Sequence, residues 1–309
     1  MSRAVIYETF GGPDVLELRE VEDPHAGSGD VRVRVTAAGL NPMDWAIAAS
    51  PEAAAMFAIT LPSGFGYDFA GVVDEVGSGV EGFAVDDRVY GGQLGRAVAD
   101  FVVIKTPTAG LDGLFHTPDA VSDEVASVLP VAGATADAAL KAIGLRAEDT
   151  VLIGGAAGGV GVFAVQLAKN LGARVIGTGS ESSFEFLRRL GAEPVSYGDG
   201  LADRVRALAP GGPTAATSLV GIETVDVALA LGVPPERIST IAAGPNPPGG
   251  VRATGGSEAP PDALDRIAAA IVAGELVVPI AATFPLDRIR EAVELQRNGH
   301  THGKIVITL

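Results

Sequence analysis

A glycine-rich stretch near the middle of the chain has the residues and the spacing of a phosphate-binding turn. The aliphatic run Val151–Ile153 predicts a buried strand, and the apolar spacing of Val162–Lys169 predicts a helix. Between them the pattern G-x-G-x-x-G is met with an alanine in first place. Because the first turn of a helix leaves N–H groups unpaired and glycine lets the backbone approach a ligand, this segment predicts a site for the pyrophosphate of a dinucleotide. The residues of the turn expected to contact the cofactor are Gly155, Ala156, Ala157, Gly158, Gly159, Val160 and Gly161.

Strands and helices alternate after this turn. A second strand is predicted at Arg174–Gly177 and a second helix at Phe184–Leu190, closed by Gly191. Because a glycine-rich turn can also be a plain connection, this context is what favours cofactor binding. The alternation predicts a doubly wound α/β fold with a parallel sheet covered on both faces. Further strands are expected at Pro194–Tyr197, Ala215–Val220 and Arg237–Ile241.

The first part of the chain has a different pattern, with short strand candidates separated by Gly, Pro and Asp clusters. Such spacing is typical of a small, barrel-like domain. A helical pattern begins at Ser122, and the final strand candidate Lys304–Leu309 is expected to return to the first domain. We therefore predict one domain of residues 1–120 with 256–309 and a second of residues 121–255. The strand candidates of the first domain are Ala4–Tyr7, Leu16–Val21, Val31–Ala37, Gly71–Val76, Arg88–Tyr90 and Asp100–Ile104, and late helices are expected at Asp262–Ala273 and from Pro285 to Arg297.

The composition narrows the class of protein. With 47% hydrophobic and 19% charged residues among 309, the chain is expected to be globular. A formal net charge of −16 argues against nucleic acid or an anionic membrane as a partner, because both would be repelled. The absence of cysteine excludes disulfides, thiolate nucleophiles, iron–sulfur clusters and cysteine-based zinc sites. The N-terminal sequence lacks the hydrophobic region of a signal peptide and no segment predicts a membrane span, so we expect a cytoplasmic protein.

A series of motifs runs in order along nearly the whole chain. They are Ala38–Asp44, Gly66–Val73, Val76–Gly77, Gly82–Phe83, Asp87–Val89, Gly133–Ala136, the glycine-rich turn and Gly303–Val306. In these motifs the chain resembles the medium-chain dehydrogenase/reductase superfamily, in its zinc-free quinone oxidoreductase branch. The resemblance implies a GroES-like, mainly β catalytic domain with a Rossmann domain inserted before its last segment. It also implies an active site in the cleft between the two domains, where a nicotinamide reaches a small-molecule substrate.

The zinc-dependent members of that superfamily hold a catalytic metal with a Cys and a Gly-His-Glu motif, and this chain differs at both places. The corresponding positions read Met43-Asp44 and Gly66-Tyr67-Asp68. The histidines are scattered, and we predict no metal site. Without zinc, alcohol oxidation would lose its Lewis acid, whereas hydride delivery to a quinone or an activated alkene needs only donors for the oxygen that becomes negative. The histidines are His25, His116, His300 and His302.

Three residues are candidates for the chemistry itself. By the resemblance, Asn41 and Tyr67 are the expected donors to the substrate oxygen, and Asp44 completes an Asn-Pro-x-Asp motif. Each has a structural alternative. Asn41 could hold a turn before Pro42, Tyr67 could be a packed aromatic of the core, and Asp44 could cap a helix, which we favour for this residue.

Further cofactor contacts are implied by the resemblance. Thr135 matches a threonine near the nicotinamide, although a threonine inside a helix could instead bond its own backbone. Ala242, Ala243 and Gly244 would pass beside the nicotinamide amide. Ala157 replaces a serine that is usual in the turn, so backbone N–H groups must hold that phosphate.

The end of the second strand favours NADPH over NADH. An NAD enzyme usually places Asp or Glu there for the ribose hydroxyls, whereas Thr178 and Ser180 leave no carboxylate to repel a 2′-phosphate. Ser180 could donate to that phosphate, and Tyr197 matches a family tyrosine beside it. Ser183, where relatives often carry Lys or Arg, and Glu181 would weaken the preference.

The sequence thus predicts an NADPH-dependent reductase of a quinone or an α,β-unsaturated carbonyl, acting without zinc. Two alternatives stay open: an enoyl reductase that tailors a polyketide-like metabolite, and a non-catalytic NADPH-binding protein. The resemblance also implies a homodimer, paired through an edge formed by Ser239–Ala243 with Val251–Thr254. The alternative for that edge is cover by its own Pro-Pro-Gly-Gly loop.

Overall fold

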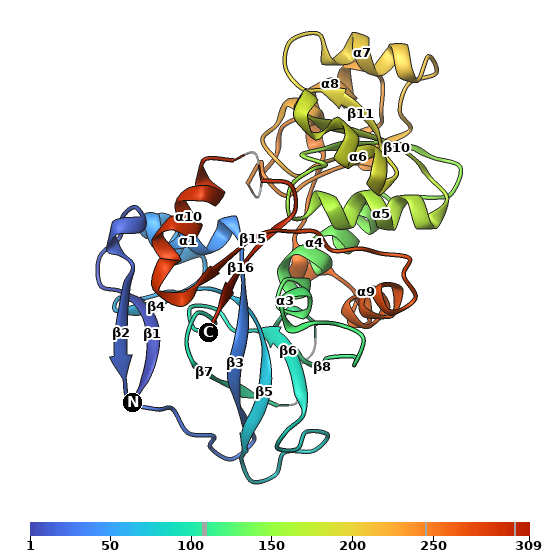
Figure 1. Ribbon diagram of the computed structural model, residues 1–309. Coiled ribbons are helices and arrows are strands. Elements are labelled where there is room, and N and C mark those ends of the chain that lie inside the picture. Colours follow the sequence, from blue (N-terminus) through green and yellow to red (C-terminus); the bar gives the residue numbers. More distant parts are fainter. Residues whose placement is uncertain (107–109, 245, 300) are drawn as a thin grey trace. The chain divides into compact units, whose positions relative to one another are not determined.

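The chain divides into two compact units (Figure 1). The computed structural model describes residues 1–106, 110–244, 246–299 and 301–309. Unit 1 consists of Met1–Val131 and Ile280–Leu309, and unit 2 is the continuous segment Ala132–Pro279. Unit 1 is mainly β and unit 2 carries a parallel sheet, so the predicted fold class is confirmed. Among the described residues, no helix is both long and apolar enough to cross a membrane.

The boundaries between the units lie later in the chain than the predicted ones after residues 120 and 255. Val131 belongs to unit 1, where its N–H donates to Asp68 Oδ1 over 3.1 Å. The helix α9 (Ala263–Val272) belongs to unit 2, where Arg266 donates to both carboxylate oxygens of Asp137 at 3.0 and 3.1 Å. The sequence shows where a helical pattern begins. The boundary between the units depends instead on which unit each helix makes its hydrogen bonds with.

Unit 1 is built on mostly antiparallel strands. Within the described residues, one sheet has the order β15-β16-β3-β5-β6-β8 with β7 paired to β3, and a smaller sheet has the order β2-β1-β4. The sequence did not predict β4 or β8, which span 2 and 3 residues and are too short to show an alternating pattern, nor β15. The strands are β1 (Ser2–Tyr7), β2 (Glu17–Val21), β3 (Asp30–Leu40), β4 (Ser63–Gly64), β5 (Asp68–Val76), β6 (Arg88–Gly92), β7 (Phe101–Lys105), β8 (Leu114–His116), β15 (Ile280–Pro285) and β16 (Lys304–Thr308), and the helices are α1 (Pro42–Ala49), α2 (Pro51–Met56), α3 (Asp123–Ala126) and α10 (Ile289–Arg297).

The last strand returns to the first part of the chain, as predicted. β16 is a run of β-branched residues that pairs antiparallel with the end of β3, with Ile305 opposite Leu40 and Ile307 opposite Ala38. This register places Lys304, the first residue of β16, next to the point where β3 passes into α1.

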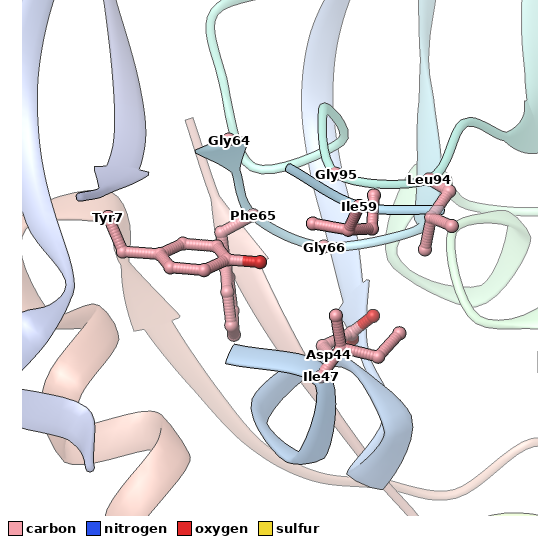
Figure 2. A pocket seen from close by; sticks show the side chains of 9 residues that line it. All are labelled: Tyr7, Asp44, Ile47, Ile59, Gly64, Phe65, Gly66, Leu94 and Gly95. Atoms are coloured by element: carbon pink, nitrogen blue, oxygen red, sulfur yellow. The ribbon is translucent and has the colours of Figure 1, made fainter. Parts of the chain in front are cut away.

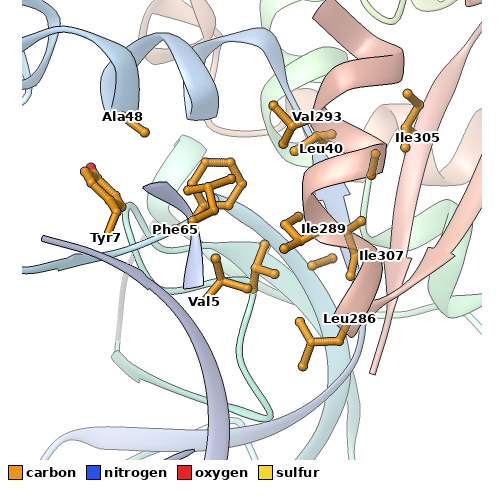
Figure 3. Packing of buried hydrophobic residues seen from close by; sticks show 14 residues of the cluster. Val5, Tyr7, Leu40, Ala48, Phe65, Leu286, Ile289, Val293, Ile305 and Ile307 are labelled. Atoms are coloured by element: carbon orange, nitrogen blue, oxygen red, sulfur yellow. The ribbon is translucent and has the colours of Figure 1, made fainter. Parts of the chain in front are cut away.

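A single apolar cluster joins both segments of unit 1 (Figure 3). Val5 of β1 and Leu40 of β3 pack with Ile307 of β16 and with Ile289 and Val293 of α10, and all of these side chains are buried. The two α10 residues are four apart and therefore lie on one face of that helix. The same core thus holds the end of β3, which carries the candidate residues, and the start of β16.

Unit 2 is doubly wound. Its sheet has the order β11-β10-β9-β12-β13-β14 within the described residues, and every neighbouring pair is parallel. Leu152 packs in a cluster with α7 and α8, while Val151 and Ile153 point to the opposite face and are also fully buried. Both faces are therefore covered, as predicted. The strands are β9 (Thr150–Gly154), β10 (Arg174–Gly179), β11 (Glu193–Ser196), β12 (Ala215–Ser218), β13 (Ile238–Thr240) and β14 (Arg252–Ala253), and the helices besides α9 are α4 (Leu129–Ala142, begun in unit 1), α5 (Gly161–Leu171), α6 (Phe184–Leu190), α7 (Leu201–Leu208) and α8 (Glu223–Ala230).

The last strand in the described order of that sheet is short. β14 pairs with β13 through Ser239 opposite Arg252 and Thr240 opposite Ala253. These residues lie within the two segments expected at a dimer edge. A second copy bound along β14 stays a prediction.

Candidate active site and cofactor-binding turn

The glycine-rich turn of unit 2 is held in place by main-chain geometry. Gly155 has a φ of +73°, in the left-handed region that favours glycine, and its N–H donates to Thr178 Oγ1 over 3.1 Å. A Cβ at Gly161, where α5 begins, would lie 2.4 Å from the carbonyl oxygens of Gly155 and Ala156. The turn therefore brings the backbone directly onto the start of α5, where the positive end of the helix dipole suits an anion.

Ala156 occupies the place of the first glycine in the motif, and a neighbour makes room for it. Its methyl group is fully buried and its N–H donates to Thr178 O over 3.2 Å. A Cβ at Gly177 would lie 2.8 Å from the Ala156 Cβ. The departure from the usual motif is thus matched by a glycine on the adjoining strand.

The hydroxyl groups at the end of β10 and just after it are already engaged by the chain. Thr178 is buried and its Oγ1 accepts the Gly155 N–H, so it supports the turn. Ser180 Oγ lies 2.9 Å from Ser182 Oγ, and Ser183, which is buried, donates to Ser180 O over 2.7 Å. Of the two candidates, Ser180 is the one with surface exposure, and a 2′-phosphate would have to compete with Ser182 for it.

The loop after β11 presents Tyr197, which is 53% exposed. Arg204 of α7, which the sequence analysis did not single out, fixes this loop. Its Nη2 donates to the carbonyl oxygens of Ser196, Tyr197 and Gly198 at 2.9, 3.2 and 2.9 Å. No sequence pattern marks an arginine that binds main-chain carbonyls, so this role could be found only from the structure.

The parallel sheet brings most of the predicted cofactor residues to one edge. The glycine-rich turn follows β9, Ser180 follows β10, Tyr197 follows β11 and the segment 242–244 follows β13, and all four strands run in the same direction. Ala242 N donates to Thr240 Oγ1 over 3.1 Å, which turns the chain as it leaves β13. Ligands of such sheets bind at the carboxyl ends of the strands. Thr135 does not follow a strand of this sheet. It is a buried residue inside α4.

Three polar side chains of unit 1 meet in its interior. Asn41 lies just after β3, Asp68 is the first residue of β5 and Lys304 is the first of β16. Asn41 Nδ2 donates to Asp68 Oδ2 over 2.8 Å, and Lys304 Nζ donates to Asn41 Oδ1 over 2.5 Å. Their exposed fractions are 2%, 0% and 2%. Buried polar groups of this kind must satisfy one another, and here each charged group has a partner.

The electrostatics of this cluster follow from burial and from its charge count. Burial raises the pKa of Asp68 to about 6, although the Lys304 ammonium and the hydrogen bonds from Asn41 and Val131 oppose that rise. Burial lowers the pKa of Lys304, and the carboxylates of Asp68 and Asp44 act in the opposite direction. The charged form of each of these two groups therefore favours the charged form of the other.

Asp44 caps α1, as favoured from the sequence. Its Oδ2 accepts the Asn41 N–H over 2.8 Å, and burial raises its pKa to about 8. Its Oδ1 is buried with no hydrogen-bond partner among the described residues. Asp44 and Tyr7 line the same small space in unit 1 (Figure 2), a cavity of about 10 Å³. Such a space has room for about one water molecule and is far too small for a quinone.

The Tyr67 hydroxyl, which was expected to be open to a substrate, is occupied by another side chain. It donates to Asp112 Oδ1, a residue that the sequence analysis did not identify. Burial, and then the hydrogen bond and charge of Asp112, raise the pKa of Tyr67. The hydroxyl therefore stays protonated, but a substrate oxygen would have to displace or share it with Asp112.

The positions that correspond to the metal ligands of zinc-dependent relatives adjoin this cluster. They read Met43-Asp44 and Gly66-Tyr67-Asp68, and the Lys304 Nζ lies 2.5 Å from Asn41 Oδ1. In the part of the chain that the structure describes, no group of three or more His, Cys, Asp or Glu side chains could hold a metal ion. His300 lies outside the described residues.

A larger hollow in unit 2, of about 450 Å³, lies at the wrong end of the sheet for a cofactor. It is lined by Asp149, Thr214 and Arg237, which directly precede β9, β12 and β13. Arg237 Nη2 donates to Asp149 Oδ2 over 2.6 Å and Thr214 Oγ1 donates to Asp149 Oδ1 over 2.7 Å. We interpret this network as structural, because it ties together the amino ends of three strands.

Two family models match the chain, one in each unit. Residues 27–115 match the alcohol dehydrogenase GroES-like domain, and residues 159–253 match the zinc-binding dehydrogenase model. The first range falls within unit 1 and the second within unit 2.

Three curated proteins illustrate the range of relatives. A quinone oxidoreductase of Pseudomonas aeruginosa is 38% identical over 217 residues, which cover 68% of this chain and 64% of that protein. A chloroplastic NADPH-dependent alkenal/one oxidoreductase of Arabidopsis thaliana is 28% identical over 334 residues, covering 99% and 79%. The spectinabilin polyketide synthase system protein NorB of Streptomyces orinoci is 40% identical over 192 residues, covering 59% and 8%. The matched region thus spans less than two thirds of the Pseudomonas protein.

Solved structures match both units together. The quinone oxidoreductase from Coxiella burnetii has a TM-score of 0.87 and 29% identity, with 100% of this chain and 99% of that chain covered. The mycobacterial protein Rv1454c, solved in complex with NADPH, has a TM-score of 0.86 and 27% identity, with both chains covered at 100%. With a GroES-like unit, a doubly wound cofactor-type unit and these relatives, the chain belongs to the medium-chain dehydrogenase/reductase superfamily and is quinone oxidoreductase-like.

Proposed function

We propose that this protein is an NADPH-dependent reductase that delivers a hydride to a quinone or an α,β-unsaturated carbonyl without zinc. The observation that carries the proposal is the buried cluster of Asn41, Asp68 and Lys304, an amide, a carboxyl and an amine that adjoin the positions where zinc-dependent relatives carry metal ligands. Reduction of a conjugated carbonyl suits such a cluster, because the charge that develops on oxygen can be stabilised by hydrogen bonds alone.

Each unit would contribute one part of the reaction. Bound NADPH would supply the hydride. The glycine-rich turn and the first turn of α5 would hold its pyrophosphate through backbone N–H groups. Asn41 and Tyr67 would donate hydrogen bonds to the substrate oxygen, Asn41 through an N–H and Tyr67 through the hydroxyl that now binds Asp112. Orientation by these groups would supply much of the rate, because the reactants are held in one geometry.

The proposal of NADPH rather than NADH rests on the end of β10. Thr178 and Ser180 offer no carboxylate to a 2′-phosphate, and a structural relative with this fold was solved with NADPH. Ser183 is buried and carries no positive charge, while Glu181 is exposed close by, so we expect a modest preference.

A screen of quinones and enones with NADPH and with NADH tests the proposal. We expect turnover of at least one quinone or enone, faster with NADPH, by protein that was purified without chelator and contains no stoichiometric zinc. Tight NADPH binding with no turnover of any compound would favour a non-catalytic NADPH-binding protein. One zinc per chain in elemental analysis would contradict the zinc-free mechanism.

A second enzyme function is favoured by the relation to a polyketide synthase protein, at 40% identity over 192 residues. An enoyl reductase would use the same hydride transfer on an enoyl thioester, so the same residues would serve. Comparison of kcat/KM for a simple quinone and for a short enoyl thioester separates the two.

We also propose a homodimer that pairs along β14, because a strand at the end of a sheet invites pairing. Light scattering at micromolar concentration should give about twice the chain mass of 31.2 kDa. The mass of a single chain would reject this assembly.

A further inference from the structure

We infer that Lys304 and Asp68 are positioning residues that hold the Asn41 carboxamide in one orientation, with its oxygen on the ammonium and one of its N–H groups on the carboxylate. The effect on turnover rests on the proposed function. The orientation itself can be measured without any substrate, so the two can fail separately.

An asparagine amide can turn over with almost no change of shape, so its orientation is decided only by its partners. Here both partners have a fixed polarity. The Lys304 ammonium can only donate, and an ionised Asp68 can only accept. A turned amide would set its NH₂ group against the ammonium at 2.5 Å and its oxygen against the carboxylate at 2.8 Å. Both contacts would be repulsive in a buried site, where charge interactions are strong.

Both charged partners are themselves tied to the main chain. Lys304 Nζ also donates to Leu40 O over 3.2 Å, and Asp68 Oδ1 accepts the Val131 N–H over 3.1 Å. The pairing of β16 and β5 on either side of β3 sets these positions, since Ile305 lies opposite Leu40 and Asp68 lies opposite Gly39. The amide is therefore held from two neighbouring strands.

This arrangement decides what Asn41 can offer to a substrate. Its oxygen accepts from Lys304 and one N–H is given to Asp68, which leaves the second Nδ2–H as a donor. An ammonium on the amide oxygen also polarises the amide and strengthens that N–H as a donor. A fixed donor of this kind can stabilise a developing oxyanion without reorganising during the reaction.

The first experiment observes the amide directly. The chain contains four asparagines, Asn41, Asn170, Asn246 and Asn298, so protein labelled with ¹⁵N at asparagine alone gives four side-chain amide pairs. Asn41→Ala assigns its pair. We expect the Asn41 protons to exchange with solvent about tenfold faster in Lys304→Met, and to be unchanged in Lys105→Met, the same substitution at an exposed position of β7 in the same unit. Unchanged Asn41 signals in Lys304→Met would overturn the inference.

A pH titration of the same signals adds a readout that packing alone would not move. Asp68 faces Lys304, Asp44 and Tyr67, and the ammonium opposes the rise of its pKa more than the hydrogen bonds from Asn41 and Val131 do. The Asn41 signals should follow Asp68 with a midpoint near pH 6, and removal of the ammonium should shift this midpoint upward. The absence of any such shift in Lys304→Met would also count against the inference.

The second experiment separates positioning from simple charge balance. Lys304→Met leaves a buried carboxylate without its cation and should lower the thermal stability, whereas Lys304→Met/Asp68→Asn removes both charges and should recover it. Positioning predicts that the double variant still has a kcat about tenfold below the wild type, with the KM for NADPH within about twofold. Full recovery of kcat together with stability would show that the pair serves only the fold. If Lys304→Met does not fold, the double variant carries the test, and its Asn41 signals decide the inference even where the wild type reduces no quinone or enone.

Discussion

The glycine-rich turn of unit 2 and the Asn41 cluster of unit 1 both make hydrogen bonds, but the turn uses main-chain groups and the cluster uses side chains. The turn consists of one continuous segment, 154–161, whose donors are main-chain N–H groups. The cluster consists of three side chains from three separate segments, and the strand register alone brings Lys304 to Asn41. A site made of backbone is limited by steric room, whereas a site made of side chains is limited by the balance of buried charge. The two should therefore respond differently to substitution.

The largest effect should come from the side-chain site. Asn41→Ala removes an N–H that we propose for the substrate oxygen, and loss of one such donor costs on the order of 10²-fold in kcat. Tyr67→Phe keeps the ring and removes only the hydroxyl, which the structure shows bound to Asp112, so we expect a smaller loss. Steady-state kinetics with the best quinone or enone measures both.

If neither variant changes kcat, no oxyanion donor lies in unit 1 at these positions. The proton would then come from solvent, and the site would act by positioning alone.

The main-chain site should separate binding from stability. A Cβ at Gly158 meets only Gly155 O, at 3.4 Å, so Gly158→Ala should leave the melting temperature unchanged and weaken NADPH binding about tenfold by keeping the pyrophosphate away. Gly161→Ala would place its Cβ 2.4 Å from two carbonyl oxygens and should cost roughly 1–3 kcal/mol of stability. Calorimetry measures the stability of both variants, and a fluorescence titration measures their affinity for NADPH. Unchanged NADPH affinity in Gly158→Ala would place the pyrophosphate elsewhere.

The charge balance of unit 1 should appear in the pH dependence of stability. The pKa of Asp44 is raised by burial to about 8, so the folded state binds its proton more tightly than the unfolded state. The stability that this proton provides is present below about pH 4 and is lost as pH rises through 8. The free energy of unfolding of Asp44→Asn, relative to that of the wild type, should therefore rise by at least about 1 kcal/mol from pH 5 to pH 8. Each unit of pKa difference is worth about 1.4 kcal/mol.

Denaturant unfolding at several pH values tests this, and Asp68, whose own pKa rises in the same direction, is present in both proteins and largely cancels. A parallel pair of pH curves would show that Asp44 is ionised in the folded protein.

The smallest effect should lie at the edge of the main-chain site, where side chains choose between cofactors. Glu181 is exposed beside Ser180, and its charge should repel a 2′-phosphate only weakly because exposed charges are screened. Glu181→Gln should raise the preference for NADPH over NADH about two- to fivefold, as measured by titration with each cofactor. Tighter binding of NADH by the wild type would overturn the proposed preference.

The same contrast explains what could be predicted from the sequence. The turn was identified because Gly155 and Gly161 must be glycine within one short segment, and the return of Lys304–Leu309 was expected from its β-branched residues. The roles of Lys304, Asp112 and Arg204 were not predicted. Each depends on a partner distant in sequence or on a main-chain carbonyl, and no local spacing records such a contact. The first boundary between the units lies later than the predicted one for the same reason, because the Val131 N–H donates to Asp68, which is distant in sequence.

The return of β16 to β3 also sets an order of events during synthesis on the ribosome. Unit 2 is continuous, so it can fold as soon as its segment has emerged, whereas the core of unit 1 lacks α10 and β16 until residues 289–308 have been made. Lys304 and Leu40 are 264 residues apart, so their contact closes a very long loop and should form late. Until then the carboxylate of Asp68 and the amide of Asn41 have no ammonium, and they stay hydrated in an open sheet. Substitutions in β16 should therefore reduce the yield of folded protein in cells more than the stability of the finished molecule would suggest.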